Sequence, residues 1–518
     1  MSLRDEADLV RESYDRVPYA SGSYHQTHPD HLATLALLHG LEAAPPARCR
    51  VLELGCSDGG NLIPMALELP ASELVGIDLS PRQIETGVAH VRELGLTNVD
   101  LRATSILDVD ASLGTFDYVI CHGVYSWVAR DVQERILAIC REHLAPNGVA
   151  YVSYNALPGW HQRAFIRDLV LHATGGVDDP EARAARAFEL IGFLSDATAR
   201  DQDPWAQILR TTREQFDAWS DQPTYLVHDY FERTNEPLYF HEFARRAATH
   251  DLRYLADAEA PMNEHDNLGP EVAGKLRALS GDAMEQEQYF DFLVNRSFRR
   301  TLLVHESATP DRTMNPDRMR RLHAATSARP VSAEPDLRPG VPETFENEKG
   351  KPFASSHPAA KGVLVALAAA WPQPVSFDAL RAQVRDADDA LIADLLWSLY
   401  WSGVAELHVE PPHCADAIGD KPRASKLARL QASRGPMVTN QRRRVLKIDD
   451  PVAKFLLLQL DGTRDRAALV RLLDAEASAG RLDISAGGER VDPLRIPMVL
   501  QAVLDHHLQR LLRLALLV

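Results

Sequence analysis

Residues Val51–Asn61, with the sequence VLELGCSDGGN, constrain the fold more than any other part of the chain. An apolar run carries the acid Glu53, turns through Gly55 and Gly59, and leads into a helix-like segment. This is the outline of a β-strand, a tight turn and a helix whose N-terminal amides face a ligand. The dinucleotide fingerprint G-x-G-x-x-G is not met, because Ser57 stands where its second glycine would be. That glycine lets the backbone approach a pyrophosphate, so its replacement argues against NAD or FAD.

A second apolar segment supports the same kind of fold. It spans Glu73–Asp78 and ends in an acid about 20 residues beyond the glycine turn, where ribose hydroxyls are held in such folds. Pro81 then marks the start of a helix, with Gln83 on its first turn. Asp78 can also serve as a helix N-cap, and both roles stay open.

Further apolar runs alternate with helical patterns in residues 1–310. We predict strands at Val99–Ala103, Phe116–His122, Val149–Tyr154, Leu252–Glu259 and Phe298–His305, the last one antiparallel, and helices at Pro29–Leu41, Asp131–Leu144 and His241–Ala248. Strands and helices that alternate at this spacing predict an α/β fold with a parallel, doubly wound sheet. Ligands bind outside the carboxyl ends of the strands in such sheets.

Composition narrows the class of protein. The chain has 518 residues, more than one hydrophobic core usually organises, so we expect two or three domains. Apolar residues make up 45% and charged residues 25%, as in ordinary soluble globular proteins. The net charge of −17 argues against a nucleic-acid-binding protein, which would present a basic face, and suits a basic partner.

Cysteine usage and apolar run lengths indicate the compartment. The five cysteines form no C-x-x-C pair, which fits a reducing environment and predicts no zinc or other metal site. The chain has no stretch of about 20 apolar residues that would span a membrane, and no apolar signal-peptide core follows Met1. We therefore expect a cytoplasmic protein that is not associated with membranes.

The segment ahead of the first predicted helix is rich in aromatic rings and histidines among serine and glycine. It holds Tyr14, Tyr19, Tyr24, His25 and His28. Such a segment can fold over a ligand bound at the glycine turn, or it can pack as an arm on the domain. Both interpretations stay open.

These patterns divide the chain into three parts. We expect an α/β domain at 1–310 that contains a helical insertion at about 160–240, a proline-rich linker at 311–358, and a mainly helical, winged-helix-like region at 359–518. Because the last region has no basic recognition helix, we expect it to contact proteins and to serve substrate access. The compact basic run Arg442–Arg444 is predicted to be a solvent-exposed turn.

Several stretches of the sequence together resemble one family. They are Val51–Asn61, HGVYSW at His122–Trp127, YNALPGW at Tyr154–Trp160, YLVHDY at Tyr225–Tyr230, NEPLYFHEF at Asn235–Phe243, EQYFDF at Glu287–Phe292, NRSFRRTLL at Asn295–Leu303 and LDGTRD at Leu460–Asp465. The family is that of the class I S-adenosylmethionine-dependent methyltransferases with a methyltransferase regulatory domain, whose best-known members are rickettsia-type protein-lysine methyltransferases. The resemblance implies a Rossmann-like methyltransferase sheet in residues 1–310, with the regulatory region at about 217–305.

The resemblance also implies S-adenosylmethionine as the cofactor and assigns residues to it. Glu53 would lie near the cationic end of the cofactor, and Gly55 would let its methionine moiety lie against the chain. Asp78 would hold the ribose, and Ser105 would lie at the adenine. The full set is Glu53, Gly55, Ser57, Gly59, Asn61, Asp78, Leu79, Gln83, Ser105, Ile106 and His122.

Residues at the ends of the fourth and fifth predicted strands would face the methyl acceptor. They are His122, Tyr125, Trp127, Tyr154 and Asn155. Aromatic rings near a sulfonium and an amine act through cation–π contacts worth about 0.5–2 kcal/mol each. Ordinary packing against the sheet is the alternative role for Tyr125 and Trp127, and His122 serves either as a base or as a cofactor ligand. Tyr225 and His228 lie on one face of a predicted helix and either line the cleft or support the structure.

Methyl transfer to a protein side chain, with lysine as the expected acceptor, is the activity that the resemblance implies. The reaction is an in-line displacement at a carbon activated by the sulfonium, so the protein must orient a lone pair and exclude water. The first lysine of the chain is Lys275, so a separate protein substrate is expected to supply the amine. Two alternatives stay open: a small-molecule O- or N-methyltransferase, and a cofactor-binding module without turnover.

Overall fold

The structure of the chain is a computed structural model. It describes residues 21–201, 203–218, 229–232, 234–259, 269–313, 315–347, 350–384, 387–486, 489–490 and 496–518. The predictions for Tyr14 and Tyr19, and those for Tyr225 and His228, lie outside the described residues.

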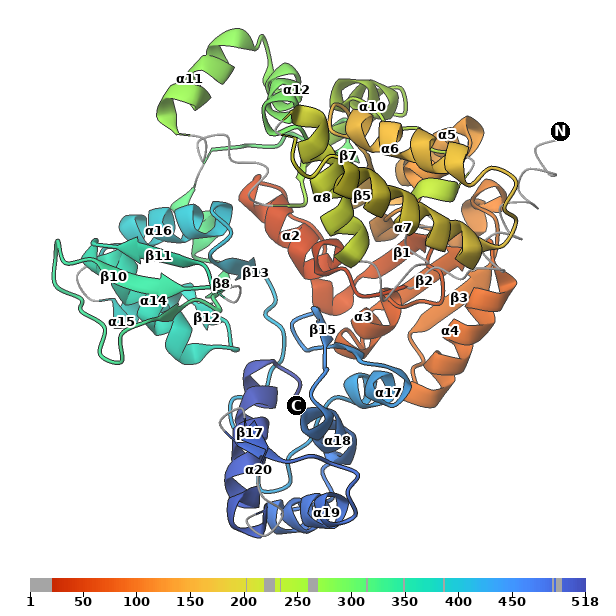
Figure 1. The fold of residues 1–518 in the computed structure, drawn as a ribbon. Helices are drawn as coiled ribbons and strands as arrows, with labels where there is room; N and C mark the ends of the chain where they lie inside the picture. Colours follow the sequence, from red (N-terminus) through yellow and green to blue (C-terminus); the bar gives the residue numbers. More distant parts are fainter. Residues whose placement is uncertain are drawn as a thin grey trace.

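A seven-stranded mixed sheet forms the centre of the molecule, with the strand order β3-β2-β1-β4-β5-β7-β6 (Figure 1). Its strands are β1 (Arg50–Leu54), β2 (Glu73–Asp78), β3 (Val99–Ala103), β4 (Phe116–Cys121), β5 (Leu144–Asn155), β6 (Leu252–Asp257) and β7 (Phe298–His305). Strands β1 to β5 pair in parallel, whereas β7 runs antiparallel to both β5 and β6. The predicted Rossmann-like α/β fold and its antiparallel last strand are confirmed.

Two element ends differ from the prediction by more than two residues, for local reasons. Strand β5 begins at Leu144 and not at Val149, because a shift in register lets Leu144 pair with Phe116 of β4. The first long helix ends at Leu38 and not at Leu41, since Gly40 adopts a φ of +76°, a left-handed conformation that stops a helix.

Helices cover both faces of the sheet, because alternate residues of its strands are buried on opposite sides. Val51 belongs to the core beneath α2, α3 and α4, whereas its neighbour Leu52 belongs to the core beneath α5 and α10. The helices are α2 (Pro29–Leu38), α3 (Leu62–Glu68), α4 (Pro81–Leu94), α5 (Arg130–His143) and α10 (Phe240–Ala248). Short 3-10 turns connect the elements: η1 (His25–Thr27), η2 (Pro46–Arg48), η3 (Ile106–Asp108), η4 (Ala111–Leu113) and η5 (Tyr125–Trp127).

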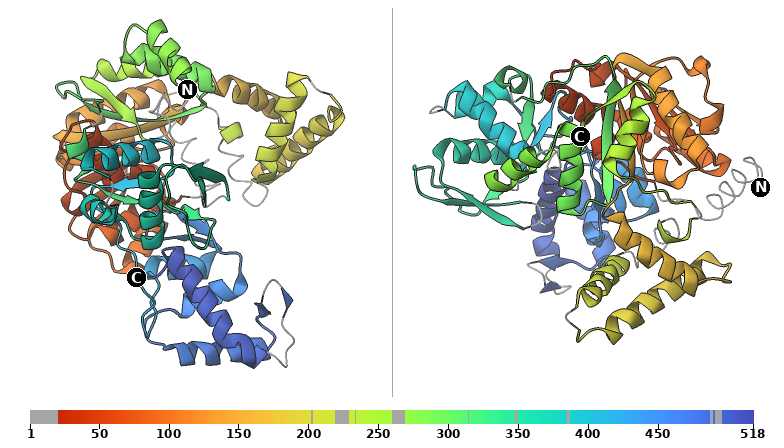
Figure 2. Two further views of the ribbon diagram at one scale, coloured as in Figure 1. Left: turned by 90° about the vertical axis from the view of Figure 1, so that its left-hand side faces the viewer. Right: turned by 90° about the horizontal axis from the view of Figure 1, so that it is seen from above.

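The predicted helical insertion follows β5. It consists of α6 (Trp160–Ala173), α7 (Pro180–Ala197) and α8 (Pro204–Ala218), which enclose an apolar cluster of their own that includes Ile166, Ile191 and Phe216. Figure 2 shows α7 and α8, coloured olive, standing off from the sheet. Two further helices, α11 (Pro270–Leu279) and α12 (Ala283–Val294), connect β6 to β7.

Residues 311–358, which we predicted as a linker, are folded. They contain α13 (Pro316–Met319), β8 (His323–Ala325), β9 (Arg329–Pro330), β10 (Glu343–Glu346) and β11 (Pro352–Ser355). The prolines mark element ends here: Pro316 and Pro358 occupy the first turns of helices, and Pro352 opens a strand. The prolines therefore mark the starts of short helices and strands, and the prediction of a linker at 311–358 is wrong.

These short elements share a core with the large sheet. Their strands form two small sheets, ordered β12-β8-β13 and β11-β10-β9, with β12 (Val375–Ser376) and β13 (Glu406–His408) from the residues that follow. The helices α14 (Pro358–Ala370), α15 (Phe377–Gln383) and α16 (Asp389–Trp401) belong to the same unit. Leu322, Phe377 and Leu396 belong to the same apolar cluster as Leu35 of α2 and Val51 of β1. The boundary that we expected between about 310 and 358 does not separate two cores.

The C-terminal unit is helical with two hairpins and has its own core. It contains α17 (Lys426–Arg434), β14 (Met437–Thr439), β15 (Val445–Lys447), α18 (Pro451–Gln459), α19 (Arg466–Ser478), β16 (Ser485–Ala486), β17 (Glu489–Arg490) and α20 (Ile496–Arg513). In Figure 1 it lies below α3 and α4, and Leu427 packs there against Ile63 and Leu94. Among the described helices, none combines the length and the apolar character needed to cross a bilayer.

Candidate active site

The predicted cofactor residues lie at the carboxyl ends of β1, β2, β3 and β4. The parallel register places Glu53 of β1 level with Gly76 of β2 and Ile120 of β4, so the loops that follow these strands emerge at one edge. The Thr104 N–H donates to the carbonyl of Asp78, which brings Ser105 beside the end of β2. The structure therefore gathers residues that are far apart in the sequence.

The glycine turn leaves no room for side chains. Gly55 has a φ of +75°, and a Cβ atom there would lie 2.5 Å from Cγ2 of Val124. Gly59 has a φ of +76°, and a Cβ atom there would lie 2.9 Å from Cδ1 of Leu101. Both positions therefore require glycine, for the left-handed backbone and for the close approach of a neighbour.

Ser57 adapts to the turn through its contacts with the second strand. It has a φ of +53°, and its N–H donates to Oδ2 of Asp78 at 2.8 Å. Its hydroxyl contacts the amide oxygen of Gln83, whose helix begins with Ser80 as N-cap. The second oxygen of Asp78 accepts from the Ser80 N–H at 2.9 Å. Asp78 thus holds the glycine turn and the helix start together. The helix N-cap is Ser80 and not Asp78, so the N-cap role considered for Asp78 is wrong, and its ribose role stays a prediction.

Glu53 is buried beneath the turn. Its Oε1 accepts a hydrogen bond from Nδ2 of Asn61 at 2.8 Å, and its Oε2 is enclosed without a hydrogen-bond partner among the described residues. Burial raises the pKa of Glu53 to about 7, with a contribution from Asp78 in the same direction, while the bond from Asn61 opposes the shift. A cationic group at this position would stabilise the ionised carboxylate.

A segment from the N-terminal side covers this turn. The Tyr24 N–H donates to Oδ1 of Asn61 at 3.0 Å, and the Tyr24 ring lies 4.1 Å from the His122 ring, centroid to centroid. Nδ1 of His122 is 2.9 Å from the Tyr151 hydroxyl and 3.2 Å from the Ser153 hydroxyl. Burial, helped by the positive charge of Arg300, lowers the pKa of His122 to about 3. The imidazole is therefore neutral at physiological pH.

Two of the predicted acceptor-side residues lie inside the core. Tyr125 and Tyr154 are 0% and 1% exposed, and both rings contact Phe243 of α10, at centroid distances of 5.2 Å and 4.2 Å. The Tyr154 hydroxyl is 3.2 Å from Thr301 Oγ1 on β7. Burial raises the pKa of Tyr125 to about 12 and shifts the pKa of Tyr154 upward as well.

Trp127 lies on η5, and Asn155, which is 3% exposed, is the last residue of β5. The Trp127 ring is edge-on to Trp160, which opens α6, at a centroid distance of 6.0 Å. The Asn155 N–H donates to the Ser126 hydroxyl at 2.9 Å, and its Nδ2 donates to Oδ1 of Asn235 at 3.0 Å. Asn235 was not among the residues that we assigned to the site, although it opens one of the stretches that carry the family resemblance.

The remaining predicted residues lie on the rim. Leu79 and Ile106 are half-buried, and the Ser105 hydroxyl caps η3 by accepting from the Leu107 N–H at 3.2 Å. Across the described ranges, no group of three or more histidine, cysteine or acidic side chains is arranged to hold a metal ion.

Three family descriptions match parts of the chain. Residues 52–150 match a methyltransferase domain, 222–305 a predicted methyltransferase regulatory domain, and 420–516 the C-terminal winged helix domain of PKMT. Together they cover most of β1 to β5, the segment that follows the insertion through β7, and the C-terminal unit.

Relatives and solved structures extend these matches. The uncharacterized protein RP789 of Rickettsia prowazekii is 33% identical over 495 residues, which cover 92% of this chain and 88% of that protein. PKMT2 of Rickettsia typhi, solved in complex with AdoHcy, is 30% identical with a TM-score of 0.87 and covers 96% of this chain and 100% of its own. A ubiquinone biosynthesis O-methyltransferase of Cereibacter sphaeroides is 35% identical over only 104 residues, or 20% of this chain.

Proposed function

We propose, from the premise that this chain belongs to the S-adenosylmethionine-dependent methyltransferases with a regulatory domain and a PKMT winged helix domain, that it methylates lysine side chains of a protein. The chain is an S-adenosylmethionine-dependent methyltransferase. The protein-lysine activity is our proposal. It rests on the likeness to PKMT2 over 96% of the chain, whereas the likeness to a small-molecule methyltransferase stops at 20%.

The residues at the strand ends fit the cofactor. The glycine turn packs closely against Val124 and Leu101, which fixes its backbone at the strand ends. The buried Oε2 of Glu53, which has no partner among the described residues, suits a cationic amine. Asp78 ends β2 beside the glycine turn, and its carboxylate oxygens accept the N–H groups of Ser57 and Ser80. A carboxylate at this strand end is the kind of group that holds ribose hydroxyls in such folds. We assign the cofactor to Glu53, Gly55, Gly59 and Asp78, with Ser105 and Ile106 at the adenine end.

The cofactor, when bound, supplies a methyl group on a sulfonium centre, and the chain's own residues orient and shield the acceptor. His122 is neutral and a weak base because its pKa is about 3, so we assign it to hydrogen bonding and not to proton removal. The Tyr24 ring lies against the His122 ring at a tilt of 46°, and we assign it to shielding the reacting atoms from water.

The acceptor side is formed by η5 and the end of β5. Because Asn155 uses its Nδ2 on Asn235, its amide oxygen is the group that can accept a hydrogen bond from an amine. Trp127 supplies an aromatic ring close by. We assign Tyr125 and Tyr154, whose rings are packed against Phe243, to the support of these two segments.

A labelling experiment tests the lysine assignment. The protein is incubated with methyl-tritiated S-adenosylmethionine and a cell lysate, and label is followed into protein bands and into the small-molecule extract. We expect label in protein, and its loss when the lysines of the lysate are first reductively dimethylated. Full labelling of the blocked lysate would show a different acceptor, and label in the extract alone would support a small-molecule substrate. A Gly55→Ala variant, whose Cβ would lie 2.5 Å from Val124, controls for contaminating activities.

A further inference from the structure

The turn between β14 and β15 of the C-terminal unit is tightly fixed. Oδ1 of Asn440 accepts the N–H groups of Arg442 and Arg444, at 3.0 Å and 2.9 Å. Arg443, at the tip, has a φ of +64°, a left-handed conformation that a non-glycine residue adopts at a cost. We expected Arg442–Arg444 at a solvent-exposed turn, but Arg442 and Arg443 are only 4% and 7% exposed.

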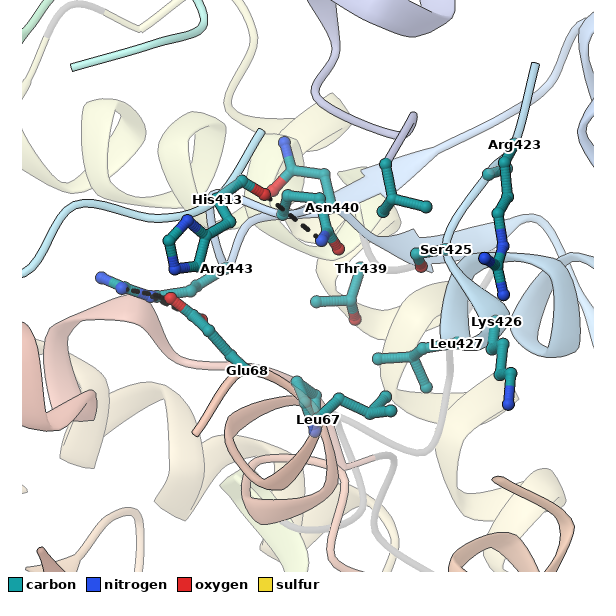
Figure 3. A pocket seen from close by; sticks show the side chains of 14 residues that line it. Leu67, Glu68, His413, Arg423, Ser425, Lys426, Leu427, Thr439, Asn440 and Arg443 are labelled. Carbon is teal, nitrogen blue, oxygen red and sulfur yellow. Dashed lines mark hydrogen bonds and ion pairs between the residues drawn. The ribbon is translucent and has the colours of Figure 1, made fainter. Parts of the chain in front are cut away.

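Arg443 is buried against two helices of the methyltransferase domain. Its Nη1 lies 2.8 Å from Oδ2 of Asp30, on the first turn of α2. Its Nε and Nη2 lie 3.0 Å and 2.5 Å from the two oxygens of Glu68, the last residue of α3. Figure 3 shows Arg443 reaching Glu68 beside a cavity of about 260 Å³. A planar guanidinium that engages two carboxylates in this way fixes their orientation as well as their charge.

The strap, which we define as residues 21–28, covers the glycine turn of the cofactor site. The Ser21 hydroxyl donates to Oδ1 of Asp58 at 2.5 Å, and Nδ2 of Asn61 donates to Thr27 Oγ1 at 3.0 Å. Tyr24 binds Asn61 through its N–H and lies against the ring of His122. The strap therefore contacts Asn61, which donates to the proposed cofactor residue Glu53, and His122, which the family resemblance places at the cofactor.

The Arg443 turn and the strap are directly joined. The Ser23 hydroxyl donates to the carbonyl of Arg443 at 3.3 Å, and Nη1 of Arg444 lies 3.0 Å from Nδ1 of His25. His28, at the end of the strap, lies 3.5 Å from Glu68 through Nε2. Asp30 follows the strap directly, so the guanidinium of Arg443 holds both the helix at the end of the strap and the helix that leaves the glycine turn.

We propose that Arg443 is a positioning residue for the cofactor site, holding the strap closed over the glycine turn so that the C-terminal unit sets how tightly the cofactor binds. The proposal rests on the cofactor residues assigned above and is independent of the methyl acceptor. A role for Arg443 in the strap can be distinguished from simple attachment of the C-terminal unit to the methyltransferase domain. A second ion pair, between Arg434 of α17 and Glu93 of α4 at 2.6 Å, joins the same two parts without touching the strap. That pair, whose side chains are about half exposed, supplies a control for contact between the two parts away from the strap.

The test compares AdoHcy binding by calorimetry in the full-length wild type, Arg443→Met and Arg434→Met. We expect Arg443→Met to raise the dissociation constant about 5-fold to 150-fold, the range of coupling between linked sites. The dissociation constant of Arg434→Met should stay within about twofold of the wild-type value, because exposed ion pairs contribute little. Arg443→Lys keeps the charge but not the planar guanidinium, so its dissociation constant should lie between those of the wild type and Arg443→Met. Hydrogen exchange should show faster exchange in residues 21–28 of Arg443→Met, with β2 unchanged. A mere structural role would not produce this localised change.

Wild-type-like binding by Arg443→Met, or equal weakening by Arg434→Met, overturns the proposal. If Arg443→Met does not fold, hydrogen exchange of the wild type decides, because coupling is reciprocal. AdoHcy should then slow exchange in residues 437–447 as well as in the strap, and protection of the strap alone would refute the link. Unimpaired binding by Gly55→Ala would show that the cofactor site itself is misassigned, which separates that failure from a failure of the Arg443 proposal.

Discussion

Asn61 donates from Nδ2 to Oε1 of Glu53 at 2.8 Å, while Oε2 of the same carboxyl is buried with no partner in the part of the chain that the structure describes. One hydrogen bond is not enough to stabilise a buried carboxylate, which is why the pKa of Glu53 rises to about 7. The site that we propose for the cofactor thus contains a carboxyl group that is half protonated near neutral pH until a cation reaches it.

Binding of AdoHcy should therefore release a proton from Glu53. The ammonium group of the ligand favours the carboxylate, so the affinity should rise with pH, by up to about tenfold per pH unit below pH 7, and level off above it. Calorimetry in buffers of different ionisation enthalpy measures the proton release. Glu53→Gln should abolish this release near pH 7, whereas equal proton release by wild type and Glu53→Gln would show that another group titrates.

The same carboxyl should destabilise the protein without cofactor at high pH. The pKa of Glu53 is higher in the folded state, about 7, than the ordinary 4.5, so the folded state binds more protons between these values. Its contribution to stability is present below pH 4.5 and is lost as the pH rises through 7. Glu53→Gln should raise the free energy of unfolding at pH 8 by about 1–3 kcal/mol relative to its effect at pH 4. Thermal unfolding of the cofactor-free proteins at the two pH values tests this.

Gly55→Ala should weaken AdoHcy binding by about 1–3 kcal/mol, because the new Cβ would lie 2.5 Å from Val124. The double variant Gly55→Ala/Val124→Ala removes the clash and should recover part of the affinity, leaving the cost of the left-handed backbone. Gly95→Ala measures the cost of the left-handed backbone alone, as a loss of unfolding free energy, since Gly95 has a φ of +72° and no neighbour within 4 Å of the added Cβ. The steric explanation fails if the double variant binds no better than the single one.

Truncated chains should show that the independent folding units divide near residue 419 and not near residue 310, where we predicted the boundary. A chain that ends at residue 320 loses Leu322, Phe377 and Leu396, which share a core with α2 and β1, so it should be insoluble or unfold at a much lower temperature. A chain that ends at residue 419 keeps this core and loses the separate C-terminal core, so it should remain folded. Circular dichroism and thermal unfolding of both distinguish the cases; a stable 1–320 fragment would restore the original partition.

Much of the methyltransferase fold was predictable because it depends on local signals. Apolar runs that end in an acid or a glycine located β1 and β2, and the bounds Glu73–Asp78, Val99–Ala103 and Phe298–His305 agree with the structure. The glycine turn was recognisable for the same reason, since a left-handed backbone at Gly55 and Gly59 leaves its mark in the residue type itself.

The acceptor side was less predictable. Sequence places Tyr125 and Tyr154 at the ends of strands, but Phe243, which encloses both rings, comes from a helix that is distant in the chain. Asn235 likewise reaches Asn155 only after the insertion has returned the chain to β5. No periodicity within a strand indicates which of its last side chains another element will cover.

The sequence by itself determined the β-strand, glycine turn and helix of the proposed cofactor site, because turn geometry and strand burial are set by neighbouring residues. Tertiary structure alone decided the role of Arg443. A run of three arginines is usually solvated, and nothing local indicates that two carboxylates, Asp30 and Glu68, will meet one of them from the far end of the chain. A buried charge depends on its partners, and which residues become partners is decided only when the chain has folded.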